Sequence, residues 1–173
     1  AKDKFAETGV LDAEAFERVI SDELIDTYDV DGAVIVRNVI SPEWVERMRI
    51  AIDEHLANWT YSKDRPAKEH LASDSKGRFF ADFFLWRVNS EFRAFLFDSA
   101  LAKVAARMMR SKTANLFYDQ LLVKEPGTEA KTPWHQDAPY WPINGWQACS
   151  IWIPFDLATP KSGVVSYVKG SHL

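Results

Sequence analysis

The sequence is poor in cysteine and contains no long apolar run. Cys149 is the only cysteine among 173 residues, so no internal disulfide can form and a reducing, cytoplasmic location is expected. Cys149 lies in an apolar stretch and is expected to be a small buried side chain. No apolar segment is long enough to span a bilayer, and the first ten residues lack the apolar region of a signal peptide. The sequence therefore favours neither a membrane protein nor a disulfide-rich secreted domain.

The sequence also has no excess of positively charged residues. The formal net charge is −4, whereas a surface for nucleic acid or anionic lipid needs clustered Lys and Arg, so neither partner is expected. Aromatic side chains, in contrast, are abundant, with seven Trp, eleven Phe and five Tyr. They indicate a large aromatic core, a lined pocket, or both. The length suits a single domain over residues 1–173 with a substantial core.

The first half of the chain has mainly helical patterns. Residues 12–32 carry apolar side chains at helical spacing. Residues 33–40, "AVIVRNVI", are short and β-branched, which predicts a strand. Ser41 and Pro42 suit the N-cap and first position of a following helix, and Asn89 suits the N-cap of another. The helices are therefore expected to precede the main sheet.

The remaining segments of this half carry two of the four histidines. Residues 60–78 are polar and punctuated by Pro and Gly, which predicts a loop with a solvated His70. His55 lies beside the apolar stripe of its helix and is expected on the helix surface. Residues 79–88, "FFADFFLWRV", are strongly aromatic and are expected to pack in the core or line a cleft.

The second half of the chain has strand patterns. Residues 114–127, 132–141, 146–157 and 163–170 are short segments separated by Pro and Gly turns. That spacing is typical of an antiparallel barrel or jelly roll. Because helices come first and strands follow, we expect an α+β fold with the helices packed outside one sheet.

The segment "TPWHQDAPYW" places His135 and Asp137 two residues apart. On a strand, such side chains point to the same face, with Cα atoms roughly 6.6 Å apart, and can converge on one ion. Non-haem Fe(II) oxygenases use two His and one carboxylate in this way. However, about half a His-x-acid match is expected by chance, and a structural histidine beside a strand aspartate has the same pattern. The residues alone leave both interpretations open.

Longer stretches of the sequence resemble a known family. The string "YDQLLVKEPGTEAKTPWHQDAPYW", followed by "WQACSIWIPFDLATPKSGVVSYVKGSHL", resembles the phytanoyl-CoA dioxygenase-like family of Fe(II)/2-oxoglutarate oxygenases. The match spans Tyr118 to Leu173, and residues 31–49, "DGAVIVRNVISPEWVERMR", resemble the N-terminal entry of that family. The combination of the "WHQD" core, the "SIWIPFD" segment and the "KSGVVSYVKGSH" turn is specific.

The resemblance implies a fold, an activity and a set of site residues. The fold would be a double-stranded β-helix, a jelly-roll or cupin-like relative. The reaction would be hydroxylation of a C–H bond of a small organic substrate with O₂, with Fe(II) as cofactor and 2-oxoglutarate as co-substrate. His135 and Asp137 would bind iron, and Gln120 and Trp152 would contact 2-oxoglutarate. Because halogenating relatives replace the carboxylate with a small residue, Asp137 favours hydroxylation.

Aromatic residues are concentrated beside the motif and suggest a surface, or substrate wall, that contacts the organic substrate. Tyr140 and Trp141 follow Asp137 directly, and residues 79–86, "FFADFFLW", form the other aromatic segment. Core packing accounts for the same side chains equally well.

The sequence lacks two residues of the family pattern. The family has a second histidine on a later strand and, beyond it, an arginine that binds the far carboxylate of 2-oxoglutarate. Here the only histidine after Asp137 is His172, and no arginine follows Arg110. Three explanations stay open. The sequence is a fragment that lacks C-terminal strands, the protein is a non-catalytic small-molecule-binding relative, or His172 or another chain supplies the third ligand.

Overall fold

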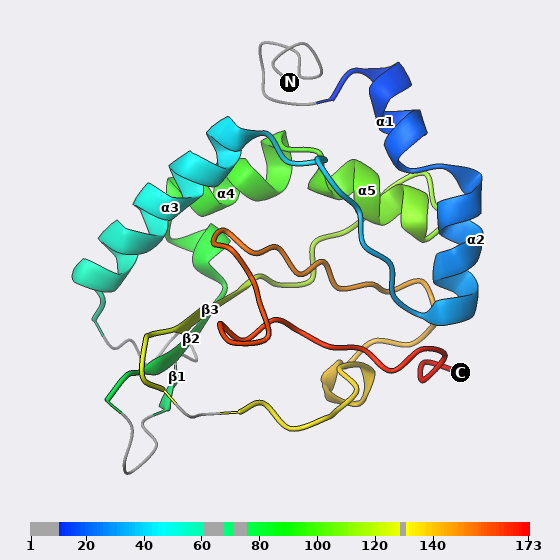
Figure 1. The fold of residues 1–173 in the computed structure, drawn as a ribbon. Helices are drawn as coiled ribbons and strands as arrows, with labels where there is room; N and C mark the ends of the chain where they lie inside the picture. Colours follow the sequence, from blue (N-terminus) through cyan, green and yellow to red (C-terminus); the bar gives the residue numbers. More distant parts are fainter. Residues whose placement is uncertain (1–10, 61–67, 71–75, 129–130) are drawn as a thin grey trace.

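The computed structural model describes residues 11–60, 76–128 and 131–173 in full and residues 68–70 by their backbone. Its helices are α1 (Ala13–Val19), α2 (Asp22–Asp31), α3 (Pro42–Ala57), α4 (Ser90–Asp98) and α5 (Leu101–Met108). Its strands are β1 (Lys68–His70), β2 (Phe79–Phe83) and β3 (Gln120–Lys124), and the 3₁₀ turns η2 (Leu85–Arg87) and η3 (Ala138–Tyr140) complete the regular structure. Figure 1 shows the helices in an arc above the sheet and to one side of it, so the predicted α+β class is confirmed.

Side-chain caps determine where the helices begin. Ser41 accepts a hydrogen bond from the Trp44 amide at the start of α3, and Asn89 caps α4, as the sequence predicts. The stretch 12–32, predicted as one helical segment, is divided because Ser21 caps a new helix directly after α1. A local capping residue thus changes the chain direction between two helices.

The sheet is antiparallel with the strand order β1-β2-β3. β2 lies in the centre and pairs with β3 from Phe79 opposite Lys124 to Phe83 opposite Gln120. β1 lies within the stretch 60–78, so the prediction of a loop is wrong for those three residues. The side chain of His70, predicted to be solvated, lies outside the described part of the chain.

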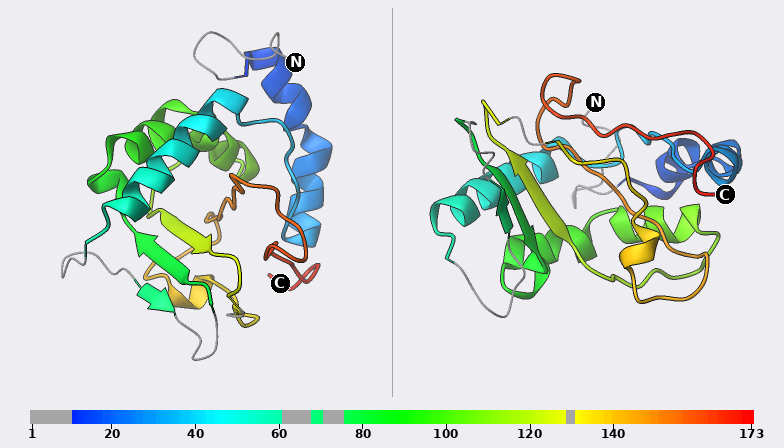
Figure 2. Two further views of the ribbon diagram at one scale, coloured as in Figure 1. Left: turned by 60° about the vertical axis from the view of Figure 1, so that its left-hand side comes forward. Right: turned by 90° about the horizontal axis from the view of Figure 1, so that it is seen from below.

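Two clusters of buried apolar side chains hold these elements together. The first packs α3 and α4 against β2 and β3, and the second packs α1 and α2 against α5 (Figure 2). The first contains Trp44, Met48, Ala51, Phe80, Leu85, Phe92, Phe95, Leu101 and Leu121. The second contains Leu11, Ala15, Phe16, Ile20, Ile25, Ala100, Val104 and Met108. Burial of these faces supplies the main driving force for folding.

The side chain of His55 is only 10% exposed, so its predicted place on the helix surface is wrong. Its Nε2 lies 2.9 Å from Oδ2 of Asp82, which is fully buried on β2. The imidazole also lies beside the rings of Phe80 and Phe92, with centroid distances of 6.2 and 6.3 Å. The side of α3 next to the apolar stripe faces the sheet, and Asp82 provides the hydrogen-bond partner that a buried imidazole requires.

Residues 33–40 were predicted as a strand, and this prediction is wrong. The segment connects α2 to α3 (Figure 1) and pairs with no other described backbone segment. Asn38 adopts a positive φ of 59°, which breaks the extended conformation. Val34, Val36 and Val39 nevertheless pack against the second cluster. The β-branched pattern therefore reflects burial without strand pairing.

The predicted strands 132–141, 146–157 and 163–170 are absent as well. In the part of the chain that the structure describes, the only regular element after β3 is the short turn η3. Every described side chain beyond Leu121 is at least partly exposed, including Trp146 at 95% and Leu157 at 83%. An extended segment counts as a strand only when a neighbouring backbone accepts and donates its hydrogen bonds. The described residues therefore do not form a jelly roll.

The single cysteine and the lack of a long apolar run can both be compared with the structure. Cys149 is partly buried, and this burial raises the pKa of its thiol, which keeps the thiol protonated and a poor nucleophile. None of the described helices is long and apolar enough to cross a membrane.

Candidate functional site

The side chains of His135 and Asp137 converge, as their spacing suggests. Nε2 of His135 lies 3.0 Å from Oδ1 of Asp137. The two side chains are 42% and 46% exposed and do not face the interior of a barrel, as the jelly-roll interpretation would require. They form a surface pair that a solute can reach directly.

A turn brings these two side chains together, in place of the predicted strand. Asp137 has helical backbone angles (φ −75°, ψ −38°) and begins η3. Pro133, Pro139 and Pro142 flank the pair. Because proline has no amide hydrogen and disrupts a ladder, this segment is poorly suited to a central strand. The prolines were visible in the sequence and are the signal against the strand interpretation.

One hydrogen bond determines which nitrogen of His135 carries a proton. Nδ1 lies 2.8 Å from the carbonyl oxygen of Pro133. A carbonyl oxygen can only accept, so Nδ1 is the donor and the neutral ring presents its lone pair at Nε2. Nε2 of His135 and Oδ1 of Asp137 are then two lone-pair donors that can bind one metal ion together.

The donor set fits a divalent metal ion in its chemistry and its spacing. Imidazole and carboxylate are the ligand types of non-haem iron sites. For metal bonds of about 2.1 Å, two ligands at a right angle lie about 3.0 Å apart, which matches the separation of Nε2 and Oδ1. The hydrogen bond from Nδ1 to a carbonyl is the usual support of a metal-binding histidine. Among the described residues, however, no group of three or more His, Cys, Asp or Glu side chains gathers.

Two neighbours of Asp137 were missed by the sequence interpretation. Ser150 donates its hydroxyl to Oδ2 of Asp137 at 3.3 Å, which leaves Oδ1 for a ligand. Partial burial raises the pKa of Tyr167, and the negative charge of Asp137 raises it further, although the side chain is still 63% exposed. Ser150 is a polar residue within the apolar run 146–157, and this was the only signal for it in the sequence.

The predicted 2-oxoglutarate residues lie at two separate positions. Gln120 is the first residue of β3 and is exposed. Trp152 is 39% exposed and belongs to the extended segment after Ser150. Both side chains are thus accessible to a small molecule.

The predicted substrate-wall residues are connected to the metal-site candidates. The ring of Tyr140 lies edge-on to His135, with a centroid distance of 6.4 Å. Trp141 donates its Nε1 hydrogen to the hydroxyl of Tyr118 at 3.3 Å. The Tyr118 ring contacts Phe83 and Phe84 of the aromatic stretch 79–86 at 6.1 and 6.0 Å. The two aromatic segments that the sequence singled out therefore meet through Tyr118.

Asp119 connects this region to the core and was not singled out from the sequence. Its backbone carbonyl accepts from the Phe84 amide, and its carboxylate lies 3.3 and 3.4 Å from the Trp86 amide. Burial raises the pKa of Asp119, although backbone donors such as the Trp86 amide partly oppose the shift. The contacts fix the start of β3 and with it the position of Gln120.

The raised pKa of Asp119 leads to a pH-dependent prediction. Because the folded state binds the Asp119 proton more tightly than the unfolded chain does, the protein loses stability as pH rises from the ordinary pKa of 3.8 through the raised value. Asp119→Asn keeps an acceptor for the Trp86 amide and removes the charge. The variant is expected to melt a few degrees above the parent at pH 7, with the difference shrinking toward pH 4. Thermal unfolding across this range measures it, and a variant that melts lower at pH 7 contradicts the prediction.

His172 does not supply a third ligand to the pair in this structure. Its Nε2 lies 3.0 Å from the backbone carbonyl oxygen of Asp29, at the end of α2. The explanation in which His172 completes the iron site is therefore wrong in this structure. His172 instead connects the C-terminal turn to the end of α2.

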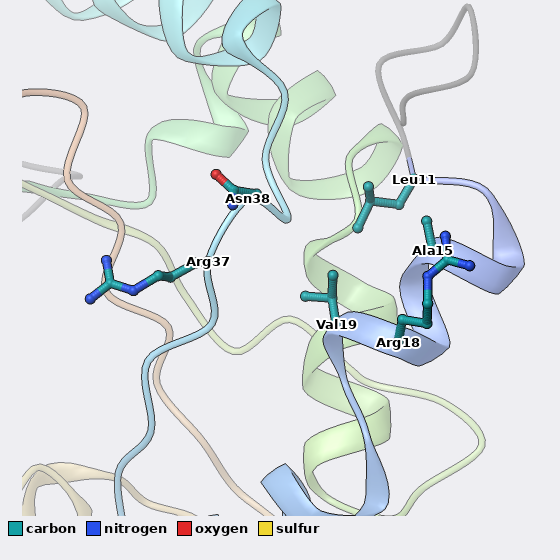
Figure 3. Close-up of a pocket in the computed structure, with 6 residues that line it drawn as sticks. All are labelled: Leu11, Ala15, Arg18, Val19, Arg37 and Asn38. Atoms are coloured by element: carbon teal, nitrogen blue, oxygen red, sulfur yellow. The ribbon is translucent and has the colours of Figure 1, made fainter. Parts of the chain in front are cut away.

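The structure also contains a small cavity of about 140 Å³ that involves none of the predicted site residues. Its walls are the aliphatic side chains of α1 and a rim of polar residues. Figure 3 shows Arg37 directed away from Val19 and Leu11, and Arg18 is paired with Glu14. The lining residues are Leu11, Ala15, Arg18, Val19, Arg37 and Asn38.

Comparison with known proteins gives one match. The family model for phytanoyl-CoA dioxygenase (PhyH) matches residues 28–173, which is most of the chain and includes His135 and Asp137. No curated protein and no solved structure matches the sequence.

Proposed function

Because the chain belongs to the phytanoyl-CoA dioxygenase family, whose members are generally Fe(II)/2-oxoglutarate-dependent oxygenases, we propose that it hydroxylates a C–H bond of a small organic substrate. The observation that carries this proposal is the 3.0 Å approach of Nε2 of His135 to Oδ1 of Asp137, with Nδ1 committed to a carbonyl. Bound iron would supply the activation of O₂. The residues of this chain bind, orient and surround the reactants.

Each residue of the site has a proposed task. His135 and Asp137 hold the ion, and Ser150 keeps the carboxylate of Asp137 turned so that Oδ1 faces Nε2. Gln120 and Trp152 contact 2-oxoglutarate, consistent with their accessible side chains. The segments 146–157 and 163–170 are exposed and unpaired among the described residues, and their alternating pattern suits strands that form only where a neighbouring backbone pairs with them, as in the jelly roll of the family.

The substrate is proposed to lie against the aromatic surface next to the ion. Tyr140 contacts His135, and Trp141 joins the Tyr118 cluster, so one aromatic wall begins at the metal ligands. Such a wall suits a substrate with an apolar body.

A non-catalytic small-molecule-binding protein of the same family is the second candidate. It is favoured by one observation, the lack of a third metal-binding side chain near His135 and Asp137 in the described residues. Such a protein would bind a 2-oxo acid or substrate without consuming O₂.

The test is formation of succinate from 2-oxoglutarate by the intact gene product after anaerobic loading with Fe(II). We expect O₂-dependent succinate release, even without the organic substrate, and none from a His135→Ala variant. Binding of 2-oxoglutarate without any succinate would support the second candidate. The absence of both would overturn the assignment to this reaction.

A further inference from the structure

Gln136, between the two proposed metal ligands, is tied to a distant part of the chain. Its side-chain amide donates to the carbonyl oxygen of Ser171, 35 residues later in the sequence. The amide is engaged by that carbonyl and has no role in the proposed chemistry. The contact places the turn 169–172, "KGSH", next to the residue that separates the two proposed ligands.

The turn 169–172 is itself docked on the C-terminal end of α2. The amide of Gly170 donates to the carbonyl of Asp31 at 2.8 Å, and Nζ of Lys169 lies 2.9 Å from Oδ1 of the same residue. The imidazole of His172 donates to the carbonyl of Asp29 at 3.0 Å. Figures 1 and 2 both show the C-terminal turn beside the end of α2.

The sequence of α2 explains why this docking is favourable. Its last turn contains Asp29 and Asp31 and no basic residue, although the end of a helix carries free carbonyls and a partial negative charge. Arg110 already pairs with the Asp29 carboxylate, and Lys169, the Gly170 amide and His172 supply a further positive charge for Asp31 and donors for the free carbonyls. Gly32 provides the left-handed C-cap (φ 79°), and a Cβ there would meet Nδ1 of His172 at 2.3 Å. The imidazole thus packs directly on the cap.

We propose that α2 and the turn 169–172 form a clamp that positions His135 and Asp137 through Gln136, which makes Gln136 a positioning residue of the metal site. The segment around the pair is exposed and has no strand pairing in the described residues, so individual side-chain contacts such as those of Ser150 and Gln136 restrict it. A glutamine side chain that holds the intervening residue limits how far the two ligand side chains can separate. The inference rests on the proposed metal site for its functional meaning, whereas the clamp itself is a property of the metal-free chain.

A simpler interpretation is that Gln136 makes an ordinary surface hydrogen bond. In that case, loss of the hydrogen bond changes neither the NMR shifts of His135 nor the affinity for metal, because an exposed substitution has little effect. The chain offers a matched control: Gln147 also donates its side-chain amide to a backbone carbonyl far away in the sequence, that of Met109 at 3.1 Å.

The experiment compares the full-length parent with Gln136→Met, Gln147→Met and His172→Phe. Methionine is unbranched and of similar length but cannot donate. Two quantities are measured: the ¹⁵N imidazole shifts of His135 in metal-free protein, which report its tautomer, and the affinity for Co(II) as a spectroscopic substitute for Fe(II). Thermal unfolding shows whether each variant is folded.

For Gln136→Met we expect a His135 spectrum that moves toward a tautomer mixture and a Co(II) affinity lower by roughly tenfold or more, the effect of losing support around a metal ligand. Its melting temperature should stay within about 2 °C of the parent. His172→Phe should shift both readouts in the same direction by roughly threefold in affinity, equivalent to one hydrogen bond.

The clamp is overturned if Gln136→Met and Gln147→Met give the same His135 spectrum as the parent. If the parent binds no Co(II), the proposed oxygenase site fails, while the His135 spectra still decide whether Gln136 positions the imidazole. If Gln136→Met fails to fold, the His172→Phe variant is used to test the proposal. His135 shifts in His172→Phe that equal those of the parent would then contradict the clamp.

Discussion

Asp137→Asn is expected to lower the affinity of the protein for Fe(II) or Co(II) by at least about 100-fold, because loss of the partners that merely surround metal ligands already costs 10- to 100-fold. The amide retains the shape of the side chain and a carbonyl oxygen that can accept from Ser150. It removes the negative charge that balances the ion. Anaerobic titration calorimetry measures the change, and succinate formation should fall with the occupancy of the site.

The control for this variant is Asp156→Asn. Asp156 is also exposed and pairs with Arg49 at the surface, so its substitution removes the same formal charge away from the pair. Surface ion pairs contribute little, and no effect on metal affinity is expected. Equal affinities of the Asp137 and Asp156 variants would remove the metal-site interpretation and leave a surface hydrogen bond.

His55→Leu is expected to destabilise the protein by about 3 kcal/mol, since it leaves the buried carboxylate of Asp82 without its imidazole partner. Leucine suits the apolar surroundings formed by Phe80 and Phe92, so loss of packing is a minor part of the effect. The midpoint of urea unfolding should fall without a change in the slope of the transition.

The double variant His55→Leu/Asp82→Leu tests whether the loss of stability comes from the interaction between these two side chains. When both polar groups are absent, no buried carboxylate has lost its imidazole partner, so the double variant should be less destabilised than the two single variants suggest. Asp53→Asn, an exposed substitution on the same helix, should change the free energy of unfolding by less than about 0.5 kcal/mol. A His55→Leu variant as stable as this control would contradict the importance of the pair.

Local chemistry made several features predictable from the sequence. Ser41 and Asn89 cap their helices as expected, because a capping side chain bonds to amides only two or three residues away. The proximity of His135 and Asp137 also follows from their short separation, although a turn around Pro133 and Pro139 achieves it in place of a strand. The order of helices and strands was sufficient for the α+β class.

Features that depend on distant segments were not predictable in the same way. Whether residues 33–40 or 146–157 form strands depends on a neighbouring backbone, and a pattern of β-branched side chains contains no information about that neighbour. His55 was assigned to the surface because its partner Asp82 is 27 residues away on β2. Both errors arise from interactions that only the folded chain creates.

The sequence by itself determined the helix starts, the fold class, the family and the two proposed metal ligands, all of which depend on neighbouring residues or on a recognisable string. The tertiary structure decided what surrounds those ligands: Ser150 on the Asp137 carboxylate, the carbonyl of Ser171 on Gln136, and the end of α2 beneath the turn 169–172. These contacts join segments separated by 13 to 143 residues, and their hydrogen bonds form only when folding has brought each donor to its acceptor.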